Sequence, residues 1–206
     1  MIRGRYVIGL TGSIGMGKSV SSRVLRRAGV PVFDADAEVH KLMAKGGRAV
    51  KLVEAAFPGV VKDGAVDRPA LGPKVFGDAA ALKRLERILH PMVGQAERAF
   101  MGHAARHRCP IVARDVPLLF ETGGDKRCDL TLVVSAPAHI QTARVLARPG
   151  MTAERLAQIR AKQMPDAQKR QRADFVISSG LGKRFAREQL QQALRYARRD
   201  LRGRHG

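Results

Sequence analysis

The chain has little of what characterises several common classes of protein. Its 206 residues include two cysteines, Cys109 and Cys128, whose spacing fits neither a disulfide scaffold nor a zinc site. It has no tryptophan, two tyrosines and seven phenylalanines, and no basic run is interleaved with aromatic residues that could stack on bases. No apolar stretch approaches the roughly 20 residues of a membrane span, and the N-terminal apolar run is too short for a secretory signal. We therefore expect a single-domain cytoplasmic protein without a membrane partner.

Acidic residues are also scarce. The chain has 18 Asp and Glu against 38 Lys and Arg, which gives a formal charge of +20. The cations are spread along the chain and are densest from Arg195 to Arg204. Such a charge could bind the phosphates of nucleic acid. Because the chain has no aromatic residues placed to stack on bases, we do not expect nucleic acid to be the main partner. A substrate with several phosphates, or a neutral compositional bias toward arginine, would account for the charge equally well.

Residues 12–19 match the pattern G-x-x-x-x-G-K-[S/T] and read Gly-Ser-Ile-Gly-Met-Gly-Lys-Ser. They follow an apolar run, Tyr6 to Leu10, and precede a helical apolar pattern that stops at Gly29. A strand, a glycine-rich turn and a helix in this order form a phosphate loop, whose N–H groups and helix dipole surround an anion. A glycine-rich turn without a ligand is the alternative, but the flanking patterns favour a nucleoside triphosphate site.

Two side chains of this loop have specific expected roles. Lys18 would reach the β- and γ-phosphates of ATP, and Ser19 would offer its hydroxyl to Mg²⁺. The residues that we expect to contact ATP are Gly12, Ser13, Gly15, Met16, Gly17, Lys18, Ser19 and Val20.

Short apolar runs alternate with longer helical patterns along the chain. This predicts an α/β fold of the P-loop NTPase type, with a parallel sheet of about five strands flanked by helices. Within the helical patterns, Gly46-Gly47 and His90-Pro91 predict breaks, whereas Asp67 and Asp78 predict helix N-termini. We divide the chain into a core of residues 1–36, 108–147 and 173–206, a helical substrate-binding insertion of residues 37–107, and a polar, basic lid of residues 148–172.

Ligands of an open parallel sheet gather beyond the carboxyl ends of its strands. Besides the phosphate loop, the residues at those ends are Asp34, Asp36, Asp115 and Ser135. Asp36 is the better candidate for a catalytic carboxylate that orients or deprotonates an acceptor hydroxyl, and Asp34 is expected to hold a metal-bound water. The alternative for either aspartate is a cap of the following helix.

Phosphoryl transfer also needs cations around the transferring group, and the segment before the lid supplies two. Arg144 and Arg148 lie one helical turn apart, at i and i+4, just before Pro149-Gly150. Both guanidiniums could converge on the polyphosphate when the lid closes and excludes water. A solvated basic face remains the alternative for this pair.

Further motifs accompany the phosphate loop, and together they span nearly the whole chain. They are the extended loop from Ile8 to Ser19, Asp34-Ala35-Asp36, Leu89-His90-Pro91, Asp115 to Glu121, Gln141 with Arg144 and Arg148, Gln163, and Ala173 to Ile177. In this order the motifs resemble those of the dephospho-coenzyme A kinase family. Ser178-Ser179 departs from the asparagine of many relatives, and the Arg-rich tail lies outside the resemblance.

The resemblance implies transfer of the ATP γ-phosphoryl group to the ribose 3′-hydroxyl of dephospho-coenzyme A, giving coenzyme A and ADP. It implies that Asp36 faces that hydroxyl and acts with Lys18, Arg144 and Arg148, and that His90 lines the acceptor pocket. A helix cap before Pro91 is the alternative for His90. Two other functions stay open, another P-loop nucleoside or nucleotide kinase and a basic nucleic-acid-binding P-loop protein.

Overall fold

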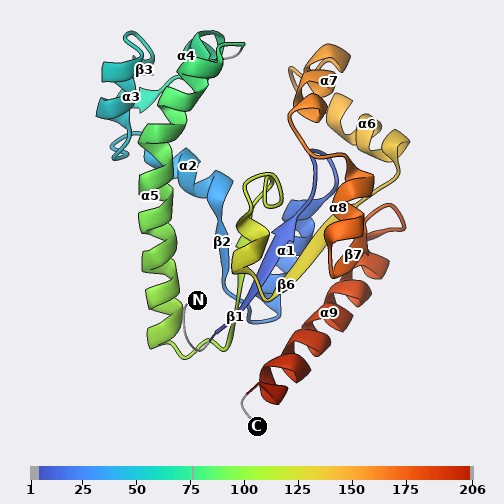
Figure 1. Ribbon diagram of the computed structural model, residues 1–206. Helices are drawn as coiled ribbons and strands as arrows, with labels where there is room; N and C mark the ends of the chain where they lie inside the picture. The colour runs from blue at the N-terminus through green and yellow to red at the C-terminus, as the bar shows by residue number, and fades with distance from the viewer. Residues whose placement is uncertain (1–4, 76, 205–206) are drawn as a thin grey trace. The chain divides into compact units, whose positions relative to one another are not determined.

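The computed structural model describes residues 5–75 and 77–204, and its main sheet has five strands in the order β2-β5-β1-β6-β7 (Figure 1). Strand β1 is central and pairs in parallel with β5 and β6, and β6 pairs in parallel with β7. This sheet confirms the α/β fold predicted from the sequence. The strands are β1 (Tyr6–Thr11), β2 (Val32–Asp34), β5 (Ile111–Asp115), β6 (Leu130–Ser135) and β7 (Phe175–Ser178).

The chain divides into two compact units. The core unit comprises Met1–Phe33 and Ala104–Gly206, and the helical unit comprises Asp34–His103. The insertion expected over 37–107 has bounds slightly later than those of the helical unit.

Helices cover the sheet of the core unit. Helix α9 packs against β7 and α1, as its apolar residues recur at helical spacing, and Leu190 and Leu194 are buried against the sheet (Figure 1). Its opposite face is basic, with Arg195 and Arg198 exposed. The helices of this unit are α1 (Lys18–Arg27), the 3-10 helix η1 (Gly124–Arg127), α6 (Ala138–Leu146), α7 (Ala153–Ala161), α8 (Asp166–Arg172) and α9 (Lys183–Gly203).

The register of the sheet places the ends of β1 and β5 next to each other. Leu10 pairs with Asp115, and the Val116 N–H donates to the Leu10 carbonyl at 3.0 Å. The Thr11 hydroxyl donates to the Pro117 carbonyl at 2.9 Å. Asp115 therefore lies beside the start of the phosphate loop, as expected for residues at the carboxyl ends of neighbouring parallel strands.

The helical unit has its own apolar core and a small hairpin that the sequence analysis did not predict. The turn of this hairpin is Asp63-Gly64, and both residues have positive φ, 53° and 78°. Asp-Gly is a strong signal for a two-residue hairpin turn, because both central positions need positive φ. The elements are α2 (Ala35–Met43), α3 (Val50–Ala56), β3 (Val61–Lys62), β4 (Ala65–Val66), α4 (Arg68–Val75) and α5 (Ala79–Arg106).

Most of the predicted helix boundaries in this unit are confirmed. The break at Gly46-Gly47 separates α2 from α3, and α4 begins directly after Asp67. The Asp78 carboxylate accepts hydrogen bonds from the Ala80 and Ala81 N–H groups at 2.8 and 3.0 Å and so caps α5.

The break predicted at His90-Pro91 is wrong, because α5 continues through Pro91. A proline inside a helix removes one backbone hydrogen bond and crowds the preceding turn. Leu85 and Leu89 before the proline are buried in the core of the helical unit, and Met92 after it packs on the same core. This packing outweighs the local cost of the proline.

Neither α5 nor any other helix in the described ranges is long and apolar enough to cross a membrane.

Candidate active site

The glycines of the phosphate loop are required by both backbone conformation and packing. Gly15 and Gly17 have φ values of 77° and 91°, a region that side chains disfavour. A Cβ atom at Gly15 would lie 2.5 Å from Val145 Cγ2, and one at Gly12 would lie 2.6 Å from the Val134 carbonyl oxygen. The loop therefore lies directly against β6 and α6 and could not accept larger residues at these positions.

Helix α1 starts where the loop ends, and Gly17 is its N-cap residue. Among the described residues no side chain caps this end, and the first turn contains no acidic residue. The N–H groups of this turn and the positive end of the helix dipole suit a phosphate group. Lys18, Ser19 and Val20 form this first turn.

A buried aspartate holds the loop lysine. Asp115 is only 2% exposed, forms an ion pair with Lys18 through Oδ1, and accepts a hydrogen bond from the Ser22 hydroxyl on Oδ2 at 2.5 Å. The sequence analysis placed Asp115 at the edge of the sheet but assigned it no role. Its position after a strand next to β1 was the available signal.

Arg144 is connected to the phosphate loop through one serine. Its guanidinium donates to the hydroxyl and to the carbonyl oxygen of Ser179, both at 2.9 Å. The Ser179 hydroxyl in turn donates to the Met16 carbonyl at 2.6 Å. The predicted helical face shared with Arg148 is wrong, because α6 ends at Leu146 and Arg148 lies in the bend that follows. Arg148 is exposed, and within the described ranges no hydrogen bond or ion pair of its guanidinium is seen. Of the two predicted arginines, the structure thus brings Arg144 to the loop and leaves Arg148 accessible to solvent.

Lys169 on α8 is a buried cation that the sequence analysis did not identify. It is fully buried, forms an ion pair with Glu121 at 2.9 Å, and donates to the Pro117 carbonyl at 3.0 Å. The Glu121 carboxylate also accepts from the Met164 N–H at 2.7 Å. These contacts join part of the segment expected as a lid, 148–172, to the Asp115 to Glu121 motif. Nothing in its spacing distinguishes Lys169 from the many solvated cations of this chain.

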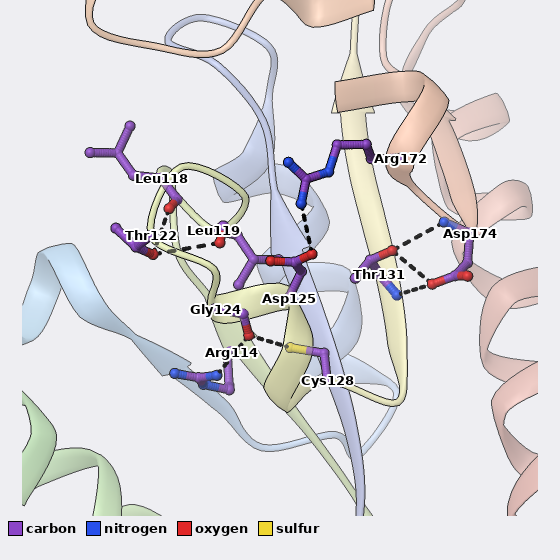
Figure 2. A network of polar contacts seen from close by, with 10 residues as sticks. All are labelled: Arg114, Leu118, Leu119, Thr122, Gly124, Asp125, Cys128, Thr131, Arg172 and Asp174. Atoms are coloured by element: carbon purple, nitrogen blue, oxygen red, sulfur yellow. Dashed lines mark hydrogen bonds and ion pairs between the residues drawn. The ribbon is translucent and has the colours of Figure 1, made fainter. Parts of the chain in front are cut away.

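A second set of polar contacts lies around the segment that follows this motif (Figure 2). Arg172 forms an ion pair with Asp125 at 3.0 Å, and its guanidinium lies 4.8 Å from the centroid of the Phe120 ring. Asp174 accepts from the backbone and the hydroxyl of Thr131, both at 2.7 Å, and so ties the start of β7 to β6. The aspartate of the 173–177 motif is therefore a structural residue.

The predicted acceptor-side residues lie in the helical unit. The Asp34 carboxylate accepts from the Ala37 N–H at 2.9 Å and caps α2, whereas Asp36 lies exposed in the first turn of that helix. His90 is exposed near the middle of α5. Because α5 does not end at Pro91, the helix-cap alternative for His90 is wrong.

The order of motifs and the loop geometry can be compared with known proteins. A family model described as dephospho-CoA kinase matches residues 6–182. The chain belongs to the dephospho-CoA kinase family. The match contains every motif on which the resemblance rested, and α9 begins just beyond it.

Individual relatives agree with the family. The dephospho-CoA kinase of Paramagnetospirillum magneticum is 66% identical over 164 residues, which cover 80% of this chain and 77% of the relative. That of Mesorhizobium japonicum is 54% identical over 203 residues, covering 97% of this chain and 98% of the relative. The crystal structure of TT1252 from Thermus thermophilus has a TM-score of 0.80 at 36% identity and covers 93% of this chain and 97% of that chain. The two relatives that are named dephospho-CoA kinases, with the family match, favour this function over the two alternatives that the sequence left open.

Proposed function

We propose that the chain transfers the γ-phosphoryl group of ATP to the ribose 3′-hydroxyl of dephospho-CoA. The observation that carries this proposal is the ion pair that holds Lys18 against Asp115 beside a phosphate loop within a dephospho-CoA kinase family chain. Phosphoryl transfer asks the protein mainly for positioning and for cations around the transferring group. The loop offers backbone donors, and Lys18, Arg144 and Arg148 supply the charge.

On the donor side, the proposed role of Lys18 is to exchange its contact with Asp115 for the β- and γ-phosphates. Asp115 is itself held by the Ser22 hydroxyl, so the carboxylate keeps a partner when Lys18 moves. Arg144 approaches the loop through Ser179, and Arg148, just beyond the end of α6, is proposed as a second cation. Together these cations would stabilise charge that develops on the transferring group.

On the acceptor side, Asp36 is proposed to accept a hydrogen bond from the attacking hydroxyl and to remove its proton. Asp36 is exposed in the first turn of α2, on the surface of the helical unit. His90, exposed on α5, is proposed to contact the acceptor. Both residues belong to the helical unit, which would provide the binding surface for the coenzyme.

Mg²⁺ is the proposed cofactor, because kinases of this type use it to neutralise the phosphates. In the described ranges, no three His, Cys, Asp or Glu side chains group together as a metal site. The residues nevertheless fit Mg²⁺, which keeps several waters and is held by substrate phosphates with few protein oxygens. The Ser19 hydroxyl, exposed in the first turn of α1, is the proposed direct ligand, and Asp34 would act through water.

An acceptor panel tests this function. The protein is mixed with ATP, Mg²⁺ and one of dephospho-CoA, AMP, adenosine or shikimate, and ADP release is followed. We expect ADP with dephospho-CoA alone, and mass spectrometry should find one added phosphoryl group on that acceptor. A dephospho-CoA analogue lacking the 3′-hydroxyl is the matched control and should give no product. Release of ADP with another acceptor but not with dephospho-CoA would disprove the proposal.

A further inference from the structure

Two glutamine side chains hold one residue of the phosphate loop. The Gln141 amide nitrogen donates to the Ile14 carbonyl at 2.8 Å, and the Ile14 N–H donates to Gln163 Oε1 at 3.2 Å. Gln141 is on α6, and Gln163 lies just beyond Lys162, the C-cap residue of α7. Both backbone groups of Ile14 therefore bond to side chains from outside the loop.

Gln141 also contacts the helix at the centre of the predicted lid. Its Oε1 accepts from the Arg160 guanidinium at 2.6 Å, and the same nitrogen of Arg160 donates to the Thr142 hydroxyl at 2.9 Å. Arg160 lies in the last turn of α7. One carboxamide thus joins the lid helix to the phosphate loop.

The orientation of the Gln141 carboxamide follows from its two partners. A guanidinium can only donate and a carbonyl oxygen can only accept, so the amide oxygen must face Arg160 and the nitrogen must face Ile14. Gln141 is only 5% exposed, and water therefore cannot easily replace either partner. If the carboxamide turned over, both contacts would be lost together.

The packing of the loop makes it sensitive to this contact. A Cβ atom at Gly15 would lie 3.1 Å from the backbone carbonyl oxygen of Gln141, so the loop backbone packs directly against α6 beside Ile14. Tightly packed elements transmit small shifts, because they leave no space that absorbs them. A displacement of Gln141 would therefore move the part of the loop that surrounds the phosphates.

We propose that Gln141 is a positioning residue that couples α7, through Arg160, to the backbone of the phosphate loop at Ile14. When Arg160 keeps its bond, the carboxamide is fixed and the loop is held in the form that receives the triphosphate. When α7 moves away, the loop loses this support. This inference rests on the proposed function, since it concerns how the same site binds ATP.

The first test uses steady-state kinetics of variants that remove one or both hydrogen bonds of the Gln141 carboxamide. Gln141→Met keeps the side-chain volume and removes both hydrogen bonds, so KM for ATP should rise about tenfold, as for one or two lost buried hydrogen bonds. We expect a smaller change in kcat and none in KM for dephospho-CoA. Gln141→Glu keeps an acceptor for Arg160 but turns a carboxylate oxygen toward the Ile14 carbonyl, and it should also weaken ATP binding. Gln192→Met, an exposed glutamine on α9, is the matched control and should behave like the parent protein.

The second test asks whether the hydrogen bonds of Gln141 to Ile14 and to Arg160 act together. Arg160→Met removes only the hydrogen bond between α7 and Gln141. The double variant with Gln141→Met should raise KM for ATP little more than Gln141→Met alone, because both substitutions break the same chain of contacts. Hydrogen exchange without nucleotide gives a readout that does not depend on activity. Amides of residues 12–17 should exchange faster in Arg160→Met, although the substituted residue is on α7. Because Arg160 is exposed, this variant keeps the test decisive if Gln141→Met does not fold.

Additive effects of the two substitutions on KM, together with unchanged loop exchange in Arg160→Met, would overturn the coupling. An unchanged KM for ATP in Gln141→Met would do the same. If the parent protein turned over no dephospho-CoA but the exchange result held, the proposed function would fail and the coupling would stand.

Discussion

Lys18 of the phosphate loop and the buried Asp115 form an ion pair across the ends of two neighbouring strands. The pair places a cation beside a glycine-rich loop and gives it a buried partner. Such an arrangement can keep the lysine positioned before it contacts a phosphate. Its consequences can be tested at both the lysine and the residues proposed to act with it.

Replacing the loop lysine should damage catalysis more than folding. Lys18→Ala removes a charge aimed at the transferring phosphoryl group, and kcat/KM should fall by about 10²–10³, or about 3–4 kcal/mol of transition-state stabilisation. Circular dichroism should show a folded protein with a lower Tm, because Asp115 loses its partner. A kcat/KM close to that of the parent protein would contradict the proposed role.

Asp36→Asn should separate chemistry from ATP binding. The amide cannot take a proton from the acceptor hydroxyl, so kcat should fall by at least about 10²-fold, while Kd for ATP measured by calorimetry stays near its original value. Asp34→Asn is a useful companion, because asparagine preserves the cap on Ala37 and removes only the charge. This companion should mainly raise the Mg²⁺ concentration needed for half-maximal activity. Near-normal turnover of Asp36→Asn would refute its acceptor role.

The buried lysine of α8 should matter for stability. Lys169→Met leaves Glu121 without its cation, and because only the lysine of this pair is fully buried, the loss of unfolding free energy should stay below the about 3–5 kcal/mol of a fully buried pair. Urea denaturation measures this loss. The double variant Lys169→Met with Glu121→Gln removes both charges and should recover much of it. Arg184→Met, which breaks the exposed pair with Glu188, is the control and should leave the urea midpoint unchanged. Equal midpoints for Lys169→Met and this control would contradict the stabilising role.

The two cysteines should differ in reactivity. Burial raises the pKa of the Cys128 thiol to about 11, against a partial lowering by Arg114, so below pH 11 the group stays mostly protonated. A thiol reagent at pH 8 should therefore modify Cys109 and leave Cys128 nearly unmodified. Labelling of Cys128 should rise only as the pH approaches 11. Cys109→Ser should abolish fast labelling, and Cys128→Ser should retain it; rapid labelling of Cys109→Ser at pH 8 would show that Cys128 is not protected.

The sequence predicted the sheet and the loop because both depend on short-range patterns. Apolar runs, turn residues and the spacing of Gly12 to Ser19 are local features. The pairing of β1 with β5 and its register were not predicted and come from the structure. The Asp63-Gly64 hairpin was equally predictable, because its signal is a dipeptide. What local patterns could not reveal was the continuity of α5 through Pro91, where packing on both sides of the proline determines the outcome.

Residues of the site divide in the same way. The roles proposed for Lys18 and Ser19 come from the loop pattern, whereas the contacts of Lys169 and Arg160 depend on residues distant in the chain. A buried lysine and a solvated one have the same sequence signal in a chain with 38 Lys and Arg. Gln141 and Gln163 were visible as motif residues, but only the structure shows that they meet at Ile14.

One carboxylate oxygen of Glu121 accepts from both the Met164 N–H and Lys169, at the two ends of a short stretch of chain. This double attachment sets where the segment can pivot. Met164 and Lys169 are both bonded to Glu121, which follows β5 in the chain. We therefore expect any rotation of the lid segment to involve α7 and not α8. The part of the chain that we expect to move is then shorter than the lid of residues 148–172 expected from the sequence. Arg160, in the last turn of α7, lies close to the point about which α7 would rotate.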